Sequence, residues 1–198
     1  MKKKRDDEPI IREQPVTYDD YAAMPDDGDR YEIIDGVLEL MSPGPMTIHQ
    51  AVSRELFLFL QSCRSDYEIY YAPIDVILSR TNVLQPDILM IHRSRLEIVK
   101  PHGIEGAPDL VVEILSPSTR KRDKVIKANA YAKHQVSEYW LVDPGARTLE
   151  QYELIEAHYE LAELYAEEDR VSSDKLPCVS FVLGEIFNEV NRLNLPTS

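Results

Sequence analysis

The segment Asp109-Leu110-Val111-Val112-Glu113-Ile114-Leu115 is apolar on both sides of an extended chain, with one glutamate as the exception. Strands that are apolar on both faces are typical of the covered centre of a sheet, so this segment predicts a central strand. Ser116-Pro117-Ser118-Thr119 follows and predicts the start of a helix that runs to about His134. Glu138-Tyr139-Trp140-Leu141-Val142-Asp143 then predicts another strand. This succession favours a sheet covered by helices.

Upstream, two β-rich runs surround Asp35-Gly36 within Tyr31–Leu40, a pattern that predicts a tight hairpin. The other predicted elements are a short helix over Thr17–Met24 with a Thr17–Asp20 capping box, a helix over 47–62, a long strand over 67–78, a strand over 85–91, short acidic strands through about Ala162, and a closing helix over 183–193. The order hairpin, α, β, β, β, α, β predicts an α/β (α+β) fold in which helices cover both faces of a mixed sheet.

A length of 198 residues suits one domain with a full hydrophobic core. The highly charged start predicts a flexible tail over residues 1–15 and one domain over 16–198. No apolar run reaches membrane-spanning length, and no signal peptide is recognisable. Cys63 and Cys178 are too few for a disulfide framework and lack metal-ligand spacing, which favours a reducing cytosol. We therefore expect a cytoplasmic protein.

The formal net charge is -13, which opposes non-specific adhesion to nucleic acid, but the charge is unevenly distributed along the chain. Residues 120–127 contain five basic side chains and one acid, whereas residues 150–170 contain eight acids and one base. A local basic patch on an acidic body can still contact phosphate, so the overall charge does not exclude a DNA partner.

Glu113 is the strongest candidate for chemistry, because a carboxylate inside an apolar strand must meet a cation, a metal or a proton. Asp87 begins another apolar strand directly after Pro86. Two carboxylates from adjacent strands form the kind of oxygen site that holds Mg²⁺. The sequence leaves two alternatives open: Glu113 can belong to a structural ion pair, and Asp87 can occupy a turn or cap position.

The predicted helix after Glu113 supplies a positive charge. Asp123, Lys127 and Tyr131 are spaced i, i+4, i+8 and therefore share one helix face, where Lys127 can stabilise a developing phosphate charge. A solvated face is the alternative. There are three weaker candidates. Glu32 is a candidate third oxygen ligand, His49 a candidate for orienting water or substrate, and Asp75 a further carboxylate on a predicted strand. No phosphate-binding loop, dinucleotide fingerprint, serine-hydrolase elbow or zinc pattern occurs in the sequence.

Four stretches in order carry a resemblance to a known family. They are Arg30-Tyr31-Glu32-Ile33-Ile34-Asp35-Gly36, Gln85-Pro86-Asp87, Val112-Glu113-Ile114-Leu115-Ser116-Pro117-Ser118-Thr119 and Glu138-Tyr139-Trp140-Leu141-Val142-Asp143-Pro144. From about Thr17 to Tyr152 the chain resembles the Uma-type restriction endonuclease family of the PD-(D/E)XK nuclease superfamily. The resemblance implies a restriction-endonuclease-like αβββαβ core, in agreement with the predicted order, and it makes the N-terminal hairpin an addition to that core.

The resemblance also implies site roles. Asp87 and Glu113 would hold a divalent cation, Mg²⁺, that activates water for cleavage of a DNA phosphodiester bond, and two-strand cleavage would favour a homodimer. Leu115 stands where the motif has lysine, and Lys127, or second to it Lys124, is similar in placement to a lysine that has moved to the helix. Two alternatives remain: an inactive nuclease fold that binds DNA or a protein, and a metal-free hydrolase that uses the two acids.

Overall fold

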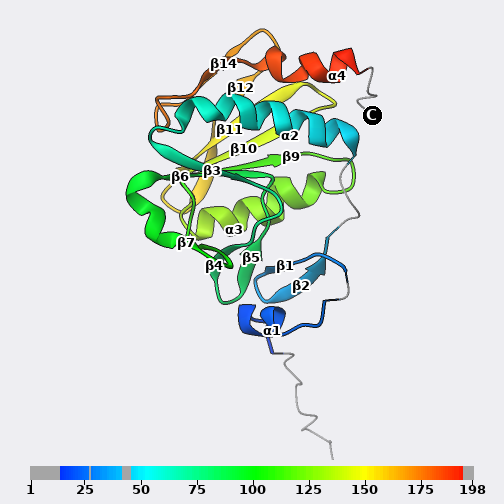
Figure 1. Ribbon diagram of the computed structural model, residues 1–198, viewed down its shortest axis with the longest axis vertical. Helices are drawn as coiled ribbons and strands as arrows, with labels where there is room; N and C mark the ends of the chain where they lie inside the picture. Colours follow the sequence, from blue (N-terminus) through cyan, green and yellow to red (C-terminus); the bar gives the residue numbers. More distant parts are fainter. Residues whose placement is uncertain (1–13, 27, 42–45, 194–198) are drawn as a thin grey trace, which may run out of the picture.

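The computed structural model describes residues 14–26, 28–41 and 46–193. Within these residues the chain forms two six-stranded sheets and a two-stranded ribbon. Helices lie on both faces of one of the six-stranded sheets, called the central sheet below (Figure 1). The tail expected at the start of the chain lies almost entirely outside these residues.

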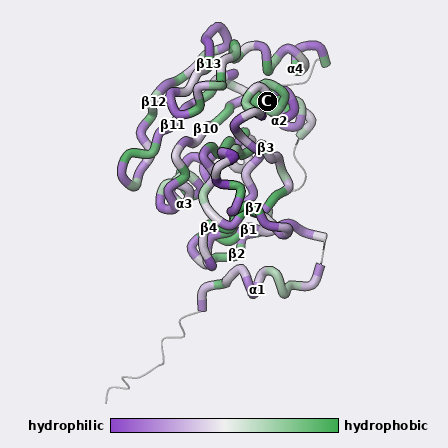
Figure 2. Tube along the Cα trace, turned by 60° about the vertical axis from the view of Figure 1, so that its left-hand side comes forward, coloured by the Kyte–Doolittle hydropathy of each residue, from purple (hydrophilic) through white to green (hydrophobic). Residues whose placement is uncertain are grey.

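The central sheet has the strand order β12-β11-β10-β9-β6-β3. Its strands are β3 (Tyr67–Tyr71), β6 (Ile88–His92), β9 (Leu110–Ile114), β10 (Glu138–Asp143), β11 (Thr148–Ile155) and β12 (His158–Tyr165). β9 and β10 are parallel and the other neighbours are antiparallel, so the sheet is mixed, as predicted. Figure 2 shows β12, β11 and β10 following one another from the edge of the molecule inward. All five β9 residues are buried, which confirms the predicted central strand.

The second sheet lies beside this core and has the order β2-β1-β5-β4-β8-β7. Its strands are β1 (Tyr31–Ile34), β2 (Val37–Leu40), β4 (Val76–Ser79), β5 (Asn82–Leu84), β7 (Val99–Lys100) and β8 (Gly103–Glu105). The predicted hairpin is confirmed as β1–β2, and Asp35 and Gly36 at its turn both have positive φ. The hairpin joins the sheet through the pairing of Ile33 with Val83.

The prediction of one long strand over 67–78 is wrong. The stretch is divided into β3, in the central sheet, and β4, in the second sheet. Pro73 lies between them, and a proline cannot donate the backbone hydrogen bond that a continuous ladder needs. The chain therefore changes sheets at this point. Asp75 directly precedes β4 and so lies at the second sheet, not at the central one.

The described residues also form helical segments, most of which lie on the two faces of the central sheet. They are α1 (Tyr18–Ala22), α2 (Thr47–Leu60), η1 (Gln61–Cys63), η2 (Arg93–Ile98), η3 (Arg122–Lys127), α3 (Ala128–Lys133), η4 (Leu183–Phe187) and α4 (Asn188–Arg192). The Thr17–Asp20 capping box of α1 is confirmed. One core cluster packs α2 and the C-terminal segments, which include the ribbon β13 (Arg170–Ser172) and β14 (Ser180–Val182), against one face. The other cluster packs α3 and the second sheet against the opposite face (Figure 1).

The helix expected over 119–134 begins as a π-helix, η3, and continues as the α-helix α3. The wider i→i+5 turn cannot be recognised from hydrophobic spacing, and such turns are frequent at functional sites. The sequence of core elements α2, β3, β6, β9, α3 and β10 is the predicted αβββαβ order, with β4, β5, β7 and β8 inserted between its strands.

Cys63 and Cys178 form a disulfide that joins η1 to the segment before β14. The two cysteines were interpreted as favouring a reducing cytosol, and this disulfide between residues 115 positions apart removes that support, because disulfides are rare in cytosolic proteins. No helix in the described ranges is long and apolar enough to cross a membrane.

Candidate active site

Asp87 and Glu113 lie at the same end of two paired strands. Ile88 of β6 pairs with Val112 of β9 in antiparallel register, so the next residues outward are Asp87 and Glu113. Side chains alternate along a strand, and the apolar residues two positions from these acids, Leu89, Val111 and Leu115, belong to the cluster on the α3 face. The register therefore brings the two acids opposite each other on one face of the sheet, at the mouth of a cavity.

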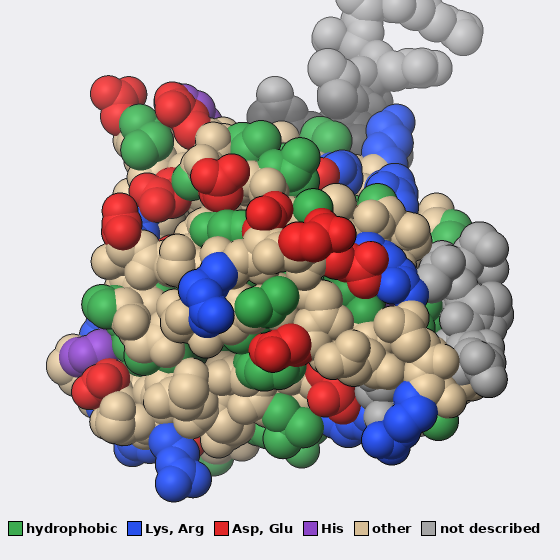
Figure 3. Space-filling view, turned by 90° about the horizontal axis from the view of Figure 1, so that it is seen from above, with side chains coloured by type: hydrophobic (Ala, Val, Ile, Leu, Met, Phe, Trp, Pro, Cys, Tyr) green, Lys and Arg blue, Asp and Glu red, His purple; other side chains and the backbone are tan. Residues whose placement is uncertain are grey.

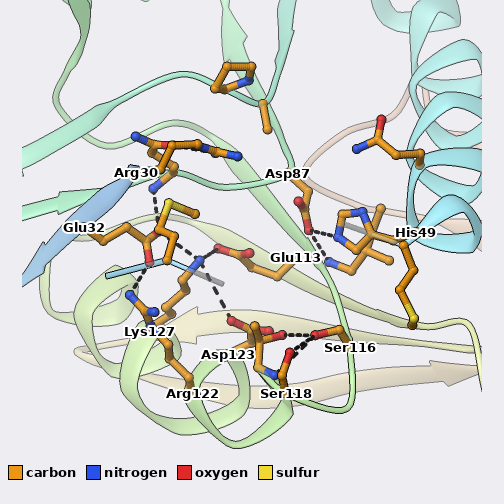
Figure 4. A pocket seen from close by; sticks show the side chains of 18 of the residues that line it. Arg30, Glu32, His49, Asp87, Glu113, Ser116, Ser118, Arg122, Asp123 and Lys127 are labelled. Carbon is orange, nitrogen blue, oxygen red and sulfur yellow. Dashed lines mark hydrogen bonds and ion pairs between the residues drawn. The ribbon is translucent and has the colours of Figure 1, made fainter. Parts of the chain in front are cut away.

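Glu113 is almost fully buried and is held through one of its two oxygens. Its Oε1 accepts a hydrogen bond from Lys127 Nζ at 3.0 Å (Figure 4). The same oxygen accepts a hydrogen bond from Tyr131 Oη at 3.0 Å. Lys127 Nζ also lies 3.9 Å from Asp123 Oδ1. The predicted helix face is therefore turned toward the strand carboxylate, and Oε2 of Glu113 accepts no hydrogen bond from the described residues.

Glu32 reaches the same cluster from the N-terminal hairpin. Its Oε1 lies 3.0 Å from Lys127 Nζ and accepts a hydrogen bond of 2.7 Å from the backbone N–H of Gln85. Its Oε2 pairs with Arg122, whose Nε lies 3.1 Å from a carboxylate oxygen of Glu39 on β2. Glu32 is thus bonded at both oxygens, and its lone pairs are directed to cations of η3 rather than to a ligand.

Asp87 is bonded from the other side of the cavity. Its Oδ2 accepts the backbone N–H of Ile114 at 2.7 Å and lies 3.1 Å from His49 Nε2 on α2. The Nδ1 atom of His49 is buried and has no hydrogen-bond partner among the described residues. Asp87 Oδ1 accepts no hydrogen bond from the described part of the chain, so each of the two strand acids keeps one oxygen without a protein donor.

The cavity between these groups has a volume of about 520 Å³. Its walls come from β1, α2, the segment before β6, the end of β9 and η3. They include Arg30, Glu32, Met41, Met46, His49, Gln85, Asp87, Glu113, Ser116, Ser118, Arg122, Asp123 and Lys127. The face of the molecule in Figure 3 has acidic and basic side chains interspersed over its described surface, in keeping with the acidic composition.

Burial and charge together shift the proton affinities here. Burial raises the pKa of Glu113 well above its usual range; the Lys127 ammonium opposes this shift, and the neighbouring acids, Asp123, Asp87 and Glu32, add to it. Burial also raises the pKa of Asp123. Burial alone would lower the pKa of Lys127, but the surrounding carboxylates outweigh it and raise the pKa above the ordinary lysine value. Lys127 therefore remains a cation, and the cluster carries more acids than its buried cations balance.

The available oxygen atoms suit a hard divalent cation that takes few protein ligands and completes its shell with water and phosphate. Among the described residues no group of three or more His, Cys, Asp and Glu side chains is arranged to hold a metal ion. Mg²⁺ takes one or two carboxylates and completes its shell with water and phosphate, so a large protein ligand set is not required. The oxygens Asp87 Oδ1 and Glu113 Oε2, which accept no hydrogen bond from the described residues, fit that preference.

The structure brings most of the sequence candidates together and separates one. Asp87, Glu113, Lys127, Glu32, His49 and Asp123 line the cavity, and Tyr131 contacts Glu113 beneath it. Asp75 is not among the residues lining the cavity and instead accepts a hydrogen bond from Gln85 Nε2 at 2.7 Å. Lys124, the second choice for the helix lysine, pairs with Glu150 at 2.6 Å.

Two cavity residues, Arg30 and Gln85, were not singled out by sequence reasoning. Arg30 immediately precedes β1, and Gln85 immediately precedes Pro86-Asp87. Their position next to candidate residues was the available signal. Polar residues often lie beside a site motif, so this position alone does not distinguish a site residue from a loop residue. What distinguishes Arg30 and Gln85 is their hydrogen bond to each other, which joins positions 55 residues apart.

Comparisons with known proteins bear on the fold and on the family. A solved structure described as a putative nuclease belonging to DUF820, from Anabaena variabilis, superposes with a TM-score of 0.72 at 21% sequence identity, covering 87% of this chain and 98% of that one. At this identity the likeness shows the fold alone, which this chain shares with that protein. No curated protein matches the sequence. The family Uma2, described as "Putative restriction endonuclease", matches residues 18–183, and the chain therefore belongs to the Uma2 family.

Proposed function

We propose that this protein is a Mg²⁺-dependent endonuclease that hydrolyses phosphodiester bonds in DNA. The observation that carries the proposal is the convergence of Asp87 and Glu113 on one cavity that also contains the buried cation Lys127. Family membership and the nuclease fold support the reaction class. Two carboxylates beside a permanent cation are suited to a substrate that carries negative charge and gains more of it during the reaction.

In this proposal Asp87 and Glu113 hold the cation through Oδ1 and Oε2, the oxygens that no described residue uses. The bound ion would supply charge neutralisation and a more acidic water. Lys127 Nζ keeps its proton and stabilises the charge that develops on the phosphate. The backbone N–H of Ile114 and the imidazole of His49 orient Asp87 through its other oxygen.

The decisive experiment compares wild type with Asp87→Asn on circular and linear DNA, with Mg²⁺ and with a chelator. The substitution is nearly isosteric but removes the charge that holds a hard cation, so we expect metal-dependent cleavage to be lost while the melting temperature changes little. Asp19→Asn is the matched control, because Asp19 is exposed and pairs with Arg80 away from the cavity. Equal cleavage by all three proteins would point to a contaminant and would refute the assignment.

A second function, DNA or protein binding without cleavage, is favoured by one observation. Leu115, which stands where the motif has lysine, is buried in the apolar core on the α3 face, so this strand position supplies no cation to the site. If Lys127 does not replace that lysine in catalysis, the wild type will bind DNA and cleave none of the substrates with Mg²⁺. The same assay therefore separates the two functions.

A further inference from the structure

Three cationic side chains line the cavity, and they differ in how their charge is balanced. Lys127 contacts three carboxylates and Arg122 contacts two, and Glu32 is a partner of both. Arg30 instead donates two hydrogen bonds to the neutral amide oxygen of Gln85, from Nε at 3.0 Å and from Nη2 at 2.5 Å. Within the described residues Arg30 forms no ion pair, and the carboxylate of Asp75, which lies beyond Gln85, only partly balances its charge on the cavity wall.

The amide of Gln85 is itself fixed, which fixes the guanidinium. Gln85 Nε2 donates to Asp75 Oδ1 at 2.7 Å, and this bond requires Oε1 to face Arg30. The backbone N–H of Gln85 donates to Glu32 Oε1, a partner of Lys127. Asp75, Gln85 and Arg30 therefore form a chain of hydrogen bonds that is anchored in the second sheet and joined to the acid cluster.

We propose that Arg30 binds a phosphate of the DNA strand next to the phosphate that lies at Asp87 and Glu113. A guanidinium is always charged and presents five N–H donors in a planar fork that matches phosphate oxygens. Gln85 uses two of these donors, and Arg30 is an exposed residue on the cavity wall (Figure 4). Only Pro86 separates Gln85 from Asp87, so the position of Arg30 relative to the acid is fixed by a short piece of backbone.

The surroundings select a phosphodiester chain over an isolated carboxylate ligand. The cavity already carries an excess of acids, which repel an anion that brings no cation of its own. A nucleic acid strand presents repeated phosphates, so one can lie at the proposed cation while its neighbour lies on Arg30. This inference rests on the proposed function, because it requires a DNA strand in the cavity.

The test measures binding of fluorescently labelled DNA by the full chain, with Ca²⁺ replacing Mg²⁺, over a series of salt concentrations. Losing one charge-assisted phosphate contact should weaken binding by Arg30→Met about tenfold and reduce the slope of log affinity against log salt by about 1. Arg30→Lys should recover part of the affinity, because an ammonium keeps the charge and loses the fork. Arg80→Met is the matched control: Arg80 is an exposed arginine paired with Asp19 outside the cavity, and its loss should leave the affinity and slope near wild type.

Indistinguishable affinities and salt slopes for Arg30→Met and Arg80→Met would overturn the phosphate subsite, as would a wild type that binds no DNA. Cleavage assays keep the two proposals separate. DNA binding that depends on Arg30, in a wild type that cleaves nothing with Mg²⁺, would refute the nuclease proposal and retain the subsite. Cleavage that depends on Asp87 and does not change in Arg30→Met would refute the phosphate subsite and retain the nuclease proposal. Melting curves of each variant exclude loss of folding as the cause.

Discussion

Glu113 and Glu138 are both buried carboxylates on the neighbouring parallel strands β9 and β10, but they face opposite sides of the central sheet. Glu138 accepts hydrogen bonds from three neutral donors: Trp140 Nε1 at 2.6 Å, Gln151 Nε2 at 2.7 Å and Ser173 Oγ at 2.7 Å. Its two oxygens are both used, and it does not line the cavity. Glu113 lies among other charges and keeps one oxygen without a donor.

The difference shows that burial of a carboxylate does not by itself mark a site. A glutamate whose lone pairs are filled by neutral donors joins elements of the fold, in this case β10, β11 and the segment after β13. A glutamate whose partners are ionic and whose second oxygen is unused, beside a cavity, is suited to bind something from outside. Four measurements test this division.

The largest expected effect is that of Lys127→Met. Lys127 is buried between Glu32, Glu113 and Asp123, so its removal leaves three acids close together without their shared cation. Removing one partner of a buried ion pair costs about 3–5 kcal/mol, and we expect a comparable loss of unfolding free energy together with loss of cleavage. Chemical denaturation with a chelator present measures the first effect. Adding Glu113→Gln to Lys127→Met should restore part of the stability, and strict additivity of the two changes would contradict the proposed coupling.

Glu113→Gln alone should reduce metal-dependent cleavage by about 10²–10³-fold, the size typical of losing one charged or donor group that stabilises a transition state. The unfolding free energy should not fall, since burial penalises the charged form of Glu113 and Lys127 keeps Glu32 and Asp123 as partners. Single-turnover rates test the expected loss of cleavage, and thermal melting of the same preparation tests the expected unchanged stability. A variant that melts early and loses activity only through unfolding would place Glu113 in the same structural class as Glu138.

Glu138→Leu should give the opposite result. Three buried donors lose their acceptor at about 1 kcal/mol or more each, so we expect a loss of about 3 kcal/mol in unfolding free energy. Cleavage per folded molecule should match wild type, because Glu138 faces away from the cavity. Loss of cleavage at a temperature where the variant is folded would show that the two faces of the sheet are coupled.

The smallest effect is a pH dependence. Burial raises the pKa of Glu138 above its ordinary value of 4.5, against the three hydrogen bonds, which lower it. A raised pKa in the folded state contributes stability that is complete below the unfolded pKa and is lost as the pH rises through the folded pKa. The stability of wild type relative to Glu138→Gln should therefore be greatest below pH 4.5 and decline above it. A difference that grows with pH would reverse the sign.

The strands that carry the site could be predicted from local pattern. The apolar runs around Glu113 and after Asp87 locate β9 and β6, and the Asp35-Gly36 turn locates the hairpin. The i, i+4, i+8 spacing placed Lys127 and Tyr131 on one face, and both contact Glu113. These features depend on residues close in sequence, where periodicity is informative.

The remaining features depend on contacts between distant residues. Glu32 was expected as an oxygen ligand, and its pairing with Lys127 and Arg122 follows from how the hairpin packs beside η3. The division of the stretch 67–78 between two sheets and the disulfide between Cys63 and Cys178 likewise depend on tertiary packing. Magnesium, DNA and the expected homodimer are questions of partners, and they stay predictions.

The hairpin β1–β2 has a practical consequence for anyone who shortens or recombines this chain. A fragment that begins at α2 would contain the whole αβββαβ core and both strand acids, and by element order it would look complete. It would nevertheless lack the carboxylate that Lys127 and Arg122 share and the arginine on the cavity wall. Chimeras with a relative should therefore exchange the hairpin and η3 together, since a hairpin from one parent beside a helix from another would mismatch acids with bases.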